Sequence, residues 1–106
     1  MTSLVIHAPE WKVQREGARS FEGVFASGIG DGYAIPQRLA LMLYVGCDVV
    51  LLNKDKQKRA EGKLRELVPT SKTKTGMQRY DVHIENLVSV PFEDERLTET
   101  GVAVFD

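Results

Sequence analysis

Residues 45–67, VGCDVVLLNKDKQKRAEGKLREL, constrain the fold of this 106-residue chain more than any other stretch. A Gly-Xaa-Asp turn leads into residues 49–52, which are apolar at every position and therefore predict a strand covered on both faces. A polar, basic tip follows over residues 53–58, and the chain then returns through residues 59–64. We therefore predict a β-hairpin with a cationic loop at its end.

The return leg of this hairpin fits two kinds of structure. Ala60, Gly62 and Leu64 alternate with charged residues, which is the period of a strand. Residues 59–68 also fit helical spacing, with Gly62 as a flaw that would cost about 1 kcal/mol in a helix interior. In a tightly curved sheet, by contrast, a glycine often marks a bulge or a corner. We favour the strand and keep the helix as the alternative.

Shorter elements surround the hairpin. Residues 4–7 form an apolar run that predicts a first strand. Residues 77–90 hold the last clear strand, because apolar and charged residues alternate in it, and Asn86 marks a break. Residues 35–44 predict a helix, with Pro36 near its start and Gly46 just beyond its end. That helix is apolar on most sides, so we expect it to be largely buried.

The remaining stretches predict loops. Residues 26–33 hold Gly28, Gly30 and Gly32 but lack the Gly-Lys-Ser/Thr ending of a phosphate-binding P-loop, so we interpret them as a surface turn. Residues 69–76 predict a polar loop. The acidic C-terminal segment, residues 93–106, is either loosely held or pairs as a terminal strand over residues 102–105.

Together these elements predict a single domain over residues 1–106. Its class is α+β, with a small, mostly antiparallel, curved β-sheet or pseudo-barrel and one main short helix. The single cysteine, Cys47, excludes an intrachain disulfide and fits a reduced, cytoplasmic setting. No signal peptide is recognisable at the start of the chain, and no apolar run approaches the roughly 20 residues of a membrane helix.

Four stretches carry a resemblance to a known family. They are the opening strand LVIHAP before a loop with Trp11, the helix PQRLALML directly before VGCDVVLL, the next strand with a small residue and a glycine in AEG, and the late strand YDVHIENL. Their order resembles the PUA-like superfamily, which includes the ASCH and EVE domains, over roughly residues 4–91. The resemblance implies a pseudo-barrel that binds RNA or modified bases.

Charge is unevenly distributed along the chain, although the net charge is only -1. Residues 54–79 hold nine cations and three anions, whereas residues 81–106 hold seven anions and one cation. Basic side chains neutralise phosphates, and aromatic side chains stack on bases. We therefore predict a non-catalytic module that binds RNA or a nucleotide-like ligand through a basic hairpin tip and a loop aromatic. The candidate residues are Lys54, Lys56, Lys58, Arg59, Lys72, Lys74, Trp11 and Tyr33.

Two other functions stay open. The acidic tail favours a protein-interaction or accessory role without nucleic acid, in which a homodimer could form through an exposed strand or through residues 102–105. A small enzyme could instead use Asp81, His83 and Glu85, which share one strand face. Neither histidine has a Cys or His partner at metal-ligand spacing, so we predict no metal site, and we predict no cofactor and no membrane partner.

Overall fold

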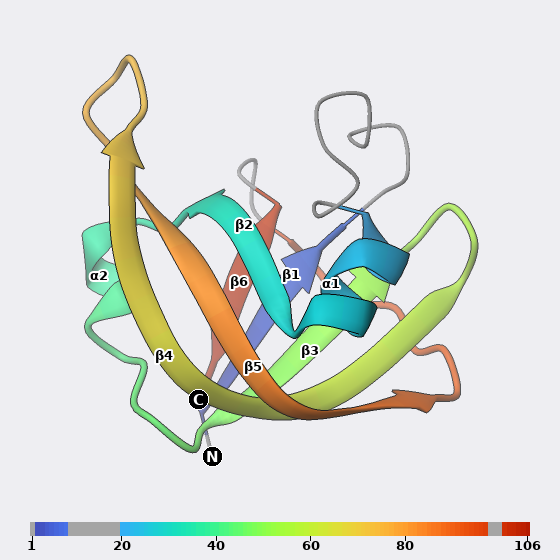
Figure 1. Cartoon of the computed structure of the whole chain (residues 1–106). Coiled ribbons are helices and arrows are strands. Elements are labelled where there is room, and N and C mark those ends of the chain that lie inside the picture. Colours follow the sequence, from blue (N-terminus) through green and yellow to red (C-terminus); the bar gives the residue numbers. More distant parts are fainter. Residues whose placement is uncertain (1, 9–19, 98–100) are drawn as a thin grey trace.

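The structure is a computed structural model, and it describes residues 2–8, 20–97 and 101–106 (Figure 1). Its elements in chain order are β1 (Ser3–His7), α1 (Phe21–Ser27), β2 (Ile29–Ala34), α2 (Gln37–Ala40), β3 (Asp48–Asn53), β4 (Lys58–Lys72), β5 (Gln78–Val90) and β6 (Val102–Phe105). Neither of these two helices is long or apolar enough to cross a membrane, within the part of the chain that the structure describes.

All six strands belong to one sheet with the order β2-β5-β4-β3-β1-β6. The β1–β3 pair is parallel, and every other neighbouring pair is antiparallel. Figure 1 shows the long strands β4 and β5 curling the sheet into a half-barrel, with α1 lying against its hollow side. The predicted small, mostly antiparallel, curved sheet is therefore confirmed in its coarse form, with two short helices in place of one.

The predicted central hairpin is confirmed. Strands β3 and β4 pair in register from Asp48 with Lys63 to Asn53 with Lys58, so the return leg is a strand and the helical alternative is wrong. Gly62 lies at a register shift between β4 and β5. A Cβ added there would lie 2.7 Å from the Glu85 carbonyl oxygen and 3.3 Å from the Leu87 Cα. Because these are backbone atoms, only glycine fits where β5 crosses the bend in β4.

Two apolar clusters cover the two faces of the sheet. The larger cluster fills the hollow side, where Leu51 and its neighbours meet Val24 of α1. On the outer side, Val50 and Leu52 pack with two side chains of the C-terminal segment, Phe92 and Leu97. This second cover explains why every residue of the 49–52 run is at most 5% exposed.

The helix predicted over residues 35–44 is shorter than expected and is not largely buried. Helix α2 is a single turn over Gln37–Ala40. Leu39 is buried, but Leu41 and Val45 are 77% and 72% exposed. The chain has to turn here because the Gly46 N–H bonds to the Leu64 carbonyl on β4, which fixes where β3 begins. Residue propensity favoured a longer helix, and this tertiary contact prevents it.

The glycine-rich stretch, residues 26–33, was predicted as a surface turn, and most of it is strand. Helix α1 comes first and was missed, although Ser20 accepts the Gly23 N–H at its N-terminus. Gly28 ends α1 with a left-handed φ of 73°, and its carbonyl accepts the Ile84 N–H of β5. Strand β2 then pairs with β5, with a register shift between Gly30 and Tyr33.

The later part of the chain holds two further corrections. Residues 69–76 were predicted as a loop, but β4 continues to Lys72. Strand β5 runs unbroken from Gln78 to Val90, with Asn86 at a φ of 58° in place of the expected break. The terminal strand is present as β6, which pairs antiparallel with β1. Of the alternatives for residues 102–105, pairing is therefore the one observed.

Candidate nucleic-acid interface

The predicted cations form two groups at opposite ends of β4 (Figure 1). Lys54, Lys56 and Lys58 belong to the β3–β4 hairpin tip, which we call the first tip. Lys72 ends β4, and Lys74 lies in the loop before β5, so both belong to the second tip. The two groups are separated by a 15-residue strand and do not form one surface.

Carboxylates offset the charge of the first tip. The Lys54 Nζ lies 3.2 Å from the Asp94 Oδ1. Lys58 pairs with Glu22 of α1, and its Nζ lies 5.9 Å from the centre of the Phe21 ring. A phosphate that approached these lysines would have to displace a carboxylate. The first tip is therefore a weaker anion site than its sequence suggests.

The Glu22–Lys58 contact predicts a small pH dependence of stability. The hydrogen bond with Lys58 lowers the pKa of Glu22 below its usual value near 4.5, so the charged form stabilises the fold above that pH. We expect this contribution to be lost as the pH falls from 4.5 through the lowered pKa of Glu22, since protonation removes the charge that Lys58 pairs with. Both side chains are about half exposed, so its size should not exceed a few tenths of a kcal/mol. Urea unfolding at pH 7 and at pH 3 measures the difference in unfolding free energy between the wild type and Glu22→Gln. The same difference at both pH values would contradict the prediction.

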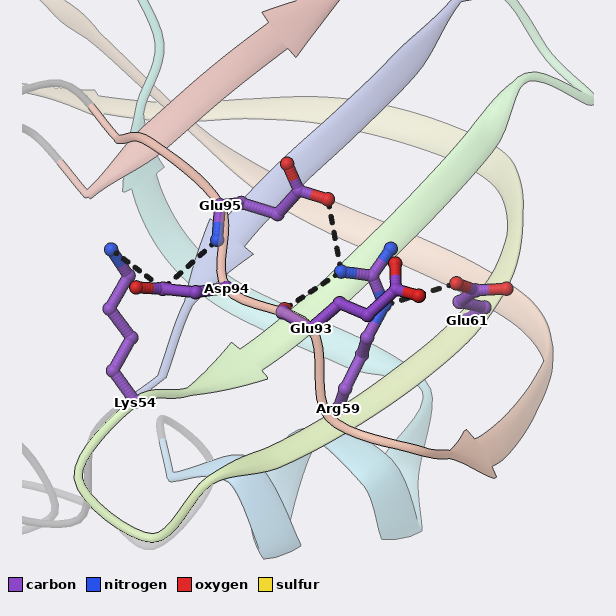
Figure 2. Close-up of polar contacts among 6 residues, drawn as sticks. All are labelled: Lys54, Arg59, Glu61, Glu93, Asp94 and Glu95. Atoms are coloured by element: carbon purple, nitrogen blue, oxygen red, sulfur yellow. Dashed lines mark hydrogen bonds and ion pairs between the residues drawn. The ribbon is translucent and has the colours of Figure 1, made fainter.

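Arg59 is buried, with its side chain 8% exposed. Figure 2 shows its polar contacts with Glu61 and with the C-terminal segment. Its Nε donates to the Glu61 Oε2 at 3.1 Å, and its Nη1 donates to the Glu95 Oε1 and to the Glu93 carbonyl, both at 3.0 Å. Burial alone would lower the pKa of Arg59, but the hydrogen bonds with Glu95 and Glu61 outweigh it and the pKa rises. Arg59 therefore holds the C-terminal segment on the sheet, and two carboxylates already offset its charge.

The predicted aromatic residues fall elsewhere. Tyr33 was expected in a loop, but it lies in β2 and is only 9% exposed, because the strand turns it into the larger apolar cluster. Its ring therefore has no open face on which a base could stack. Trp11 lies outside the described residues.

The second tip borders an open groove of about 550 Å³. Within the described residues, neither Lys72 nor Lys74 forms an ion pair. Tyr80 packs partly against the larger apolar cluster and also lines the groove. The lining residues, which include no carboxylate, are Pro36, Gln37, Lys72, Thr75, Gly76, Met77, Gln78 and Tyr80.

A second hollow, of about 370 Å³, has a different charge pattern. Its rim carries the Arg59–Glu61 contact and the Lys63–Asp48 ion pair, so each cation already has an anion. This balance makes it a poorer site for an anionic ligand than the groove at the second tip. No sequence signal pointed to either hollow, because each combines residues from distant parts of the chain.

The residues of the enzymatic alternative do not line either hollow. Asp81 accepts the Gly32 N–H at 3.0 Å, which ties β5 to β2 and gives this carboxylate a structural contact. Across residues 2–8, 20–97 and 101–106, no group of three metal-ligating side chains occurs. The geometry therefore gives the enzymatic alternative no added support.

One exposed feature was not predicted at all. Leu41, Met42, Tyr44 and Val45 are 77%, 37%, 53% and 72% exposed, and they lie within five consecutive residues. The sequence offered a signal for them, since all four are apolar, but the pattern indicated a buried helix. Single exposed apolar residues are ordinary on a protein surface, whereas four within five consecutive residues are not.

Comparisons with known proteins found no match: no protein-family model matches the chain, and neither does a curated protein or a solved structure. The resemblance to the PUA-like superfamily stays a prediction from the sequence.

Proposed function

We propose that this protein is a non-catalytic binding module for RNA or a nucleotide-like ligand, and that the ligand lies in the groove at the second tip. The observation that carries this proposal is the groove itself, which has a lysine at its rim, an aromatic ring in its wall and no lining carboxylate. Its volume of about 550 Å³ falls within the usual range for small-ligand sites. A PUA-like fold, which the sequence resembles, is part of the same proposal.

The groove residues supply the interactions that a nucleotide requires. Lys72 lines the groove and Lys74 belongs to the adjoining loop, and both would neutralise phosphates of the ligand. The exposed amide of Gln37 would bond to a base edge, whereas the Gln78 amide nitrogen already donates to the carbonyls of Ser71 and Arg79. Tyr80 would offer its ring for stacking. The module therefore needs neither the first tip nor Tyr33.

A titration with labelled RNA tests the proposal. Fluorescence anisotropy with a mixed single-stranded RNA pool, at low and at physiological salt, should show binding that weakens as salt rises. The double variant Lys72→Ala/Lys74→Ala should bind more weakly, and its log–log salt slope should be shallower by about 0.7 for each phosphate that the variant leaves without a lysine. Tyr80→Leu should weaken binding without changing the slope, because it removes stacking and no charge.

The first tip provides the matched control. Lys54→Ala/Lys56→Ala removes the same number of lysines at the other end of β4, and it should leave the affinity nearly unchanged. Loss of binding in this variant alone would place the interface at the first tip. Absence of binding at low salt, both to the RNA pool and to a nucleoside monophosphate, would reject the nucleotide-binding function.

A second candidate function is protein interaction, and the exposed apolar residues between Leu41 and Val45 favour it. The sequence alternative included a homodimer through an exposed strand or through residues 102–105. Sedimentation velocity over a hundredfold range of protein concentration tests the homodimer directly. A sedimentation coefficient that does not change with concentration would exclude it over that range.

A further inference from the structure

We propose that residues 91–97, here called the strap, form an autoinhibitory contact: their carboxylates occupy the first tip, and single-stranded RNA binds this tip once the strap is displaced. The inference rests on the proposed function for its class of ligand, but it concerns the other end of β4. The lining of the groove at the second tip includes no residue of the strap and none of the first tip. Each proposal can therefore be tested without the other.

The strap contacts Lys54 of the first tip and Arg59, which directly follows that tip (Figure 2). The Asp94 Oδ1 lies 3.2 Å from the Lys54 Nζ. The Arg59 Nη1 donates to the Glu95 Oε1 and to the Glu93 carbonyl, both at 3.0 Å. Lysine and arginine donate to carboxylates and to phosphates through the same N–H groups. The strap carboxylates thus lie where the phosphates of a polyanion bound to these two cations would lie.

The strap is attached to the sheet by its side chains. Within the described residues, none of residues 91–97 forms a backbone–backbone hydrogen bond. Phe92 and Leu97 are only partly buried against the apolar cluster on the outer side of the sheet. Asp94 is 68% exposed, so water and salt weaken its ion pair with Lys54. A segment with so few buried contacts opens at a low free energy, and a competing ligand can therefore displace it.

The same cluster explains why the strap closes again. Val50 and Leu52 of β3 are almost fully buried, and Phe92 and Leu97 pack against them. When the strap leaves, these two strand residues lose that cover and meet water, which is unfavourable for apolar side chains. The closed state is therefore favoured without a ligand, and the open state is favoured only when a ligand binds the exposed cations.

The strap also reverses the sign of the charge around the first tip. The charged groups in or next to this tip are four cations and three carboxylates, namely Lys54, Lys56, Lys58, Arg59, Glu22, Asp55 and Glu61. The strap adds the three carboxylates of residues 93–95 and one cation, Arg96. The local formal charge is therefore -1 with the strap in place and +1 without it. Of the two states, the open one attracts a polyanion.

Neutralising the strap tests the inference. The background is Lys72→Ala/Lys74→Ala, which removes the lysines of the second tip, and the probe is the labelled mixed single-stranded RNA pool at low and at physiological salt. In this background, Asp94→Asn/Glu95→Gln should raise the RNA affinity about tenfold. It should also steepen the log–log salt slope by about 0.7 for each phosphate that gains a cation. Circular dichroism checks that the variant is folded.

Two control variants show whether the gain comes from the first tip. Lys54→Ala/Lys56→Ala, added to the strap variant, should remove most of the gain, although the same change in the wild type leaves the affinity nearly unchanged. Glu66→Gln/Glu85→Gln neutralises two exposed carboxylates on β4 and β5, outside the strap. It should raise the affinity much less, and it measures the general effect of two added positive charges.

Proteolysis reports the displacement itself. Asp94→Asn alone breaks the exposed pair with Lys54 but keeps the Arg59 contacts, so this variant should stay folded and show a smaller gain in RNA affinity. It also keeps Glu93 and Glu95 as sites for a protease that cuts after glutamate. Added RNA should speed this cleavage at low salt, because a ligand that binds the open state raises its population.

Three results would each overturn the inference. The first is a gain in Asp94→Asn/Glu95→Gln no larger than the gain in Glu66→Gln/Glu85→Gln. The second is a gain that Lys54→Ala/Lys56→Ala does not reduce. The third is cleavage of Asp94→Asn that RNA leaves unchanged or slows. Equal RNA binding by the wild type and by Lys72→Ala/Lys74→Ala would instead reject the groove and leave the role of the strap intact.

Discussion

Replacing Leu51 with alanine should lower the free energy of unfolding by about 2 to 5 kcal/mol. Leu51 is fully buried in β3, in the middle of the sheet, where it lies in register with Ile6 of β1 on one side and Ala60 of β4 on the other. Because it contacts the larger apolar cluster from the central hairpin, the truncation leaves a cavity that its strand neighbours cannot fill. Urea unfolding followed by circular dichroism measures the change.

Leu41→Ala is the matched control, since it removes the same atoms from a side chain that is 77% exposed. We expect it to change the unfolding free energy by less than about 0.5 kcal/mol. The contrast between the two leucines tests which apolar residues face the core. A cost for Leu41→Ala similar to that for Leu51→Ala would mean that residues 35–44 are buried as the sequence predicted.

The hairpin could be predicted because its pattern is local. Residues 49–52 are apolar on both faces, and the alternation of Ala60, Gly62 and Leu64 is the strand period, so neighbouring residues were enough to assign β3 and the start of β4. Strand β5 was predictable for the same reason. The outer cover of β3 by Phe92 and Leu97 was not, because it depends on a contact between residues roughly forty positions apart in the sequence.

The wrong predictions for residues 35–44 and 26–33 share one physical cause. Residues 35–44 are good helix formers, yet the bonds of Gly46 and Cys47 to Leu64 restrict α2 to one turn. In residues 26–33 the glycines indicated a turn, although Gly28 ends a helix and Gly30 lies in a strand. In both stretches, pairing with a distant strand decided the structure, and local propensity did not.

The candidate site was predictable only as a set of residue types. The sequence correctly marked Lys72 and Lys74 as basic residues near a turn, and the structure places Lys72 on the groove. It could not show that Arg59 is buried among carboxylates or that Tyr33 lies in the core. The order of charges along a sequence does not show which anion lies beside a given cation in the fold. Here the carboxylates that pair with the predicted cations come from remote segments, and they are Asp94, Glu22 and Glu95.

The Arg59 contacts give the second large expected effect. Arg59→Ala should lower the unfolding free energy by about 2 to 3 kcal/mol, because it leaves the carboxylates of Glu61 and Glu95 and the Glu93 carbonyl without their shared donor. Breaking a fully buried ion pair costs more, about 3 to 5 kcal/mol. Glu61 and Glu95 keep 48% and 28% of their side-chain surface exposed, so water replaces part of what they lose.

Arg59→Ala should also free the C-terminal segment from the outer face of the sheet. A protease that cuts after glutamate should cleave the variant at Glu93 or Glu95 faster than the wild type, since Arg59 holds both residues. Lys63→Ala is the control, because it breaks the more exposed Lys63–Asp48 pair and should destabilise the fold much less than Arg59→Ala does. The loss of unfolding free energy in Arg59→Lys should lie between the losses in Lys63→Ala and Arg59→Ala. An ammonium group keeps the charge but lacks the planar fork that reaches several acceptors at once. If Arg59→Ala were no less stable than Lys63→Ala and no more readily cleaved, Arg59 would not hold this segment, and it would again be available to an anionic ligand.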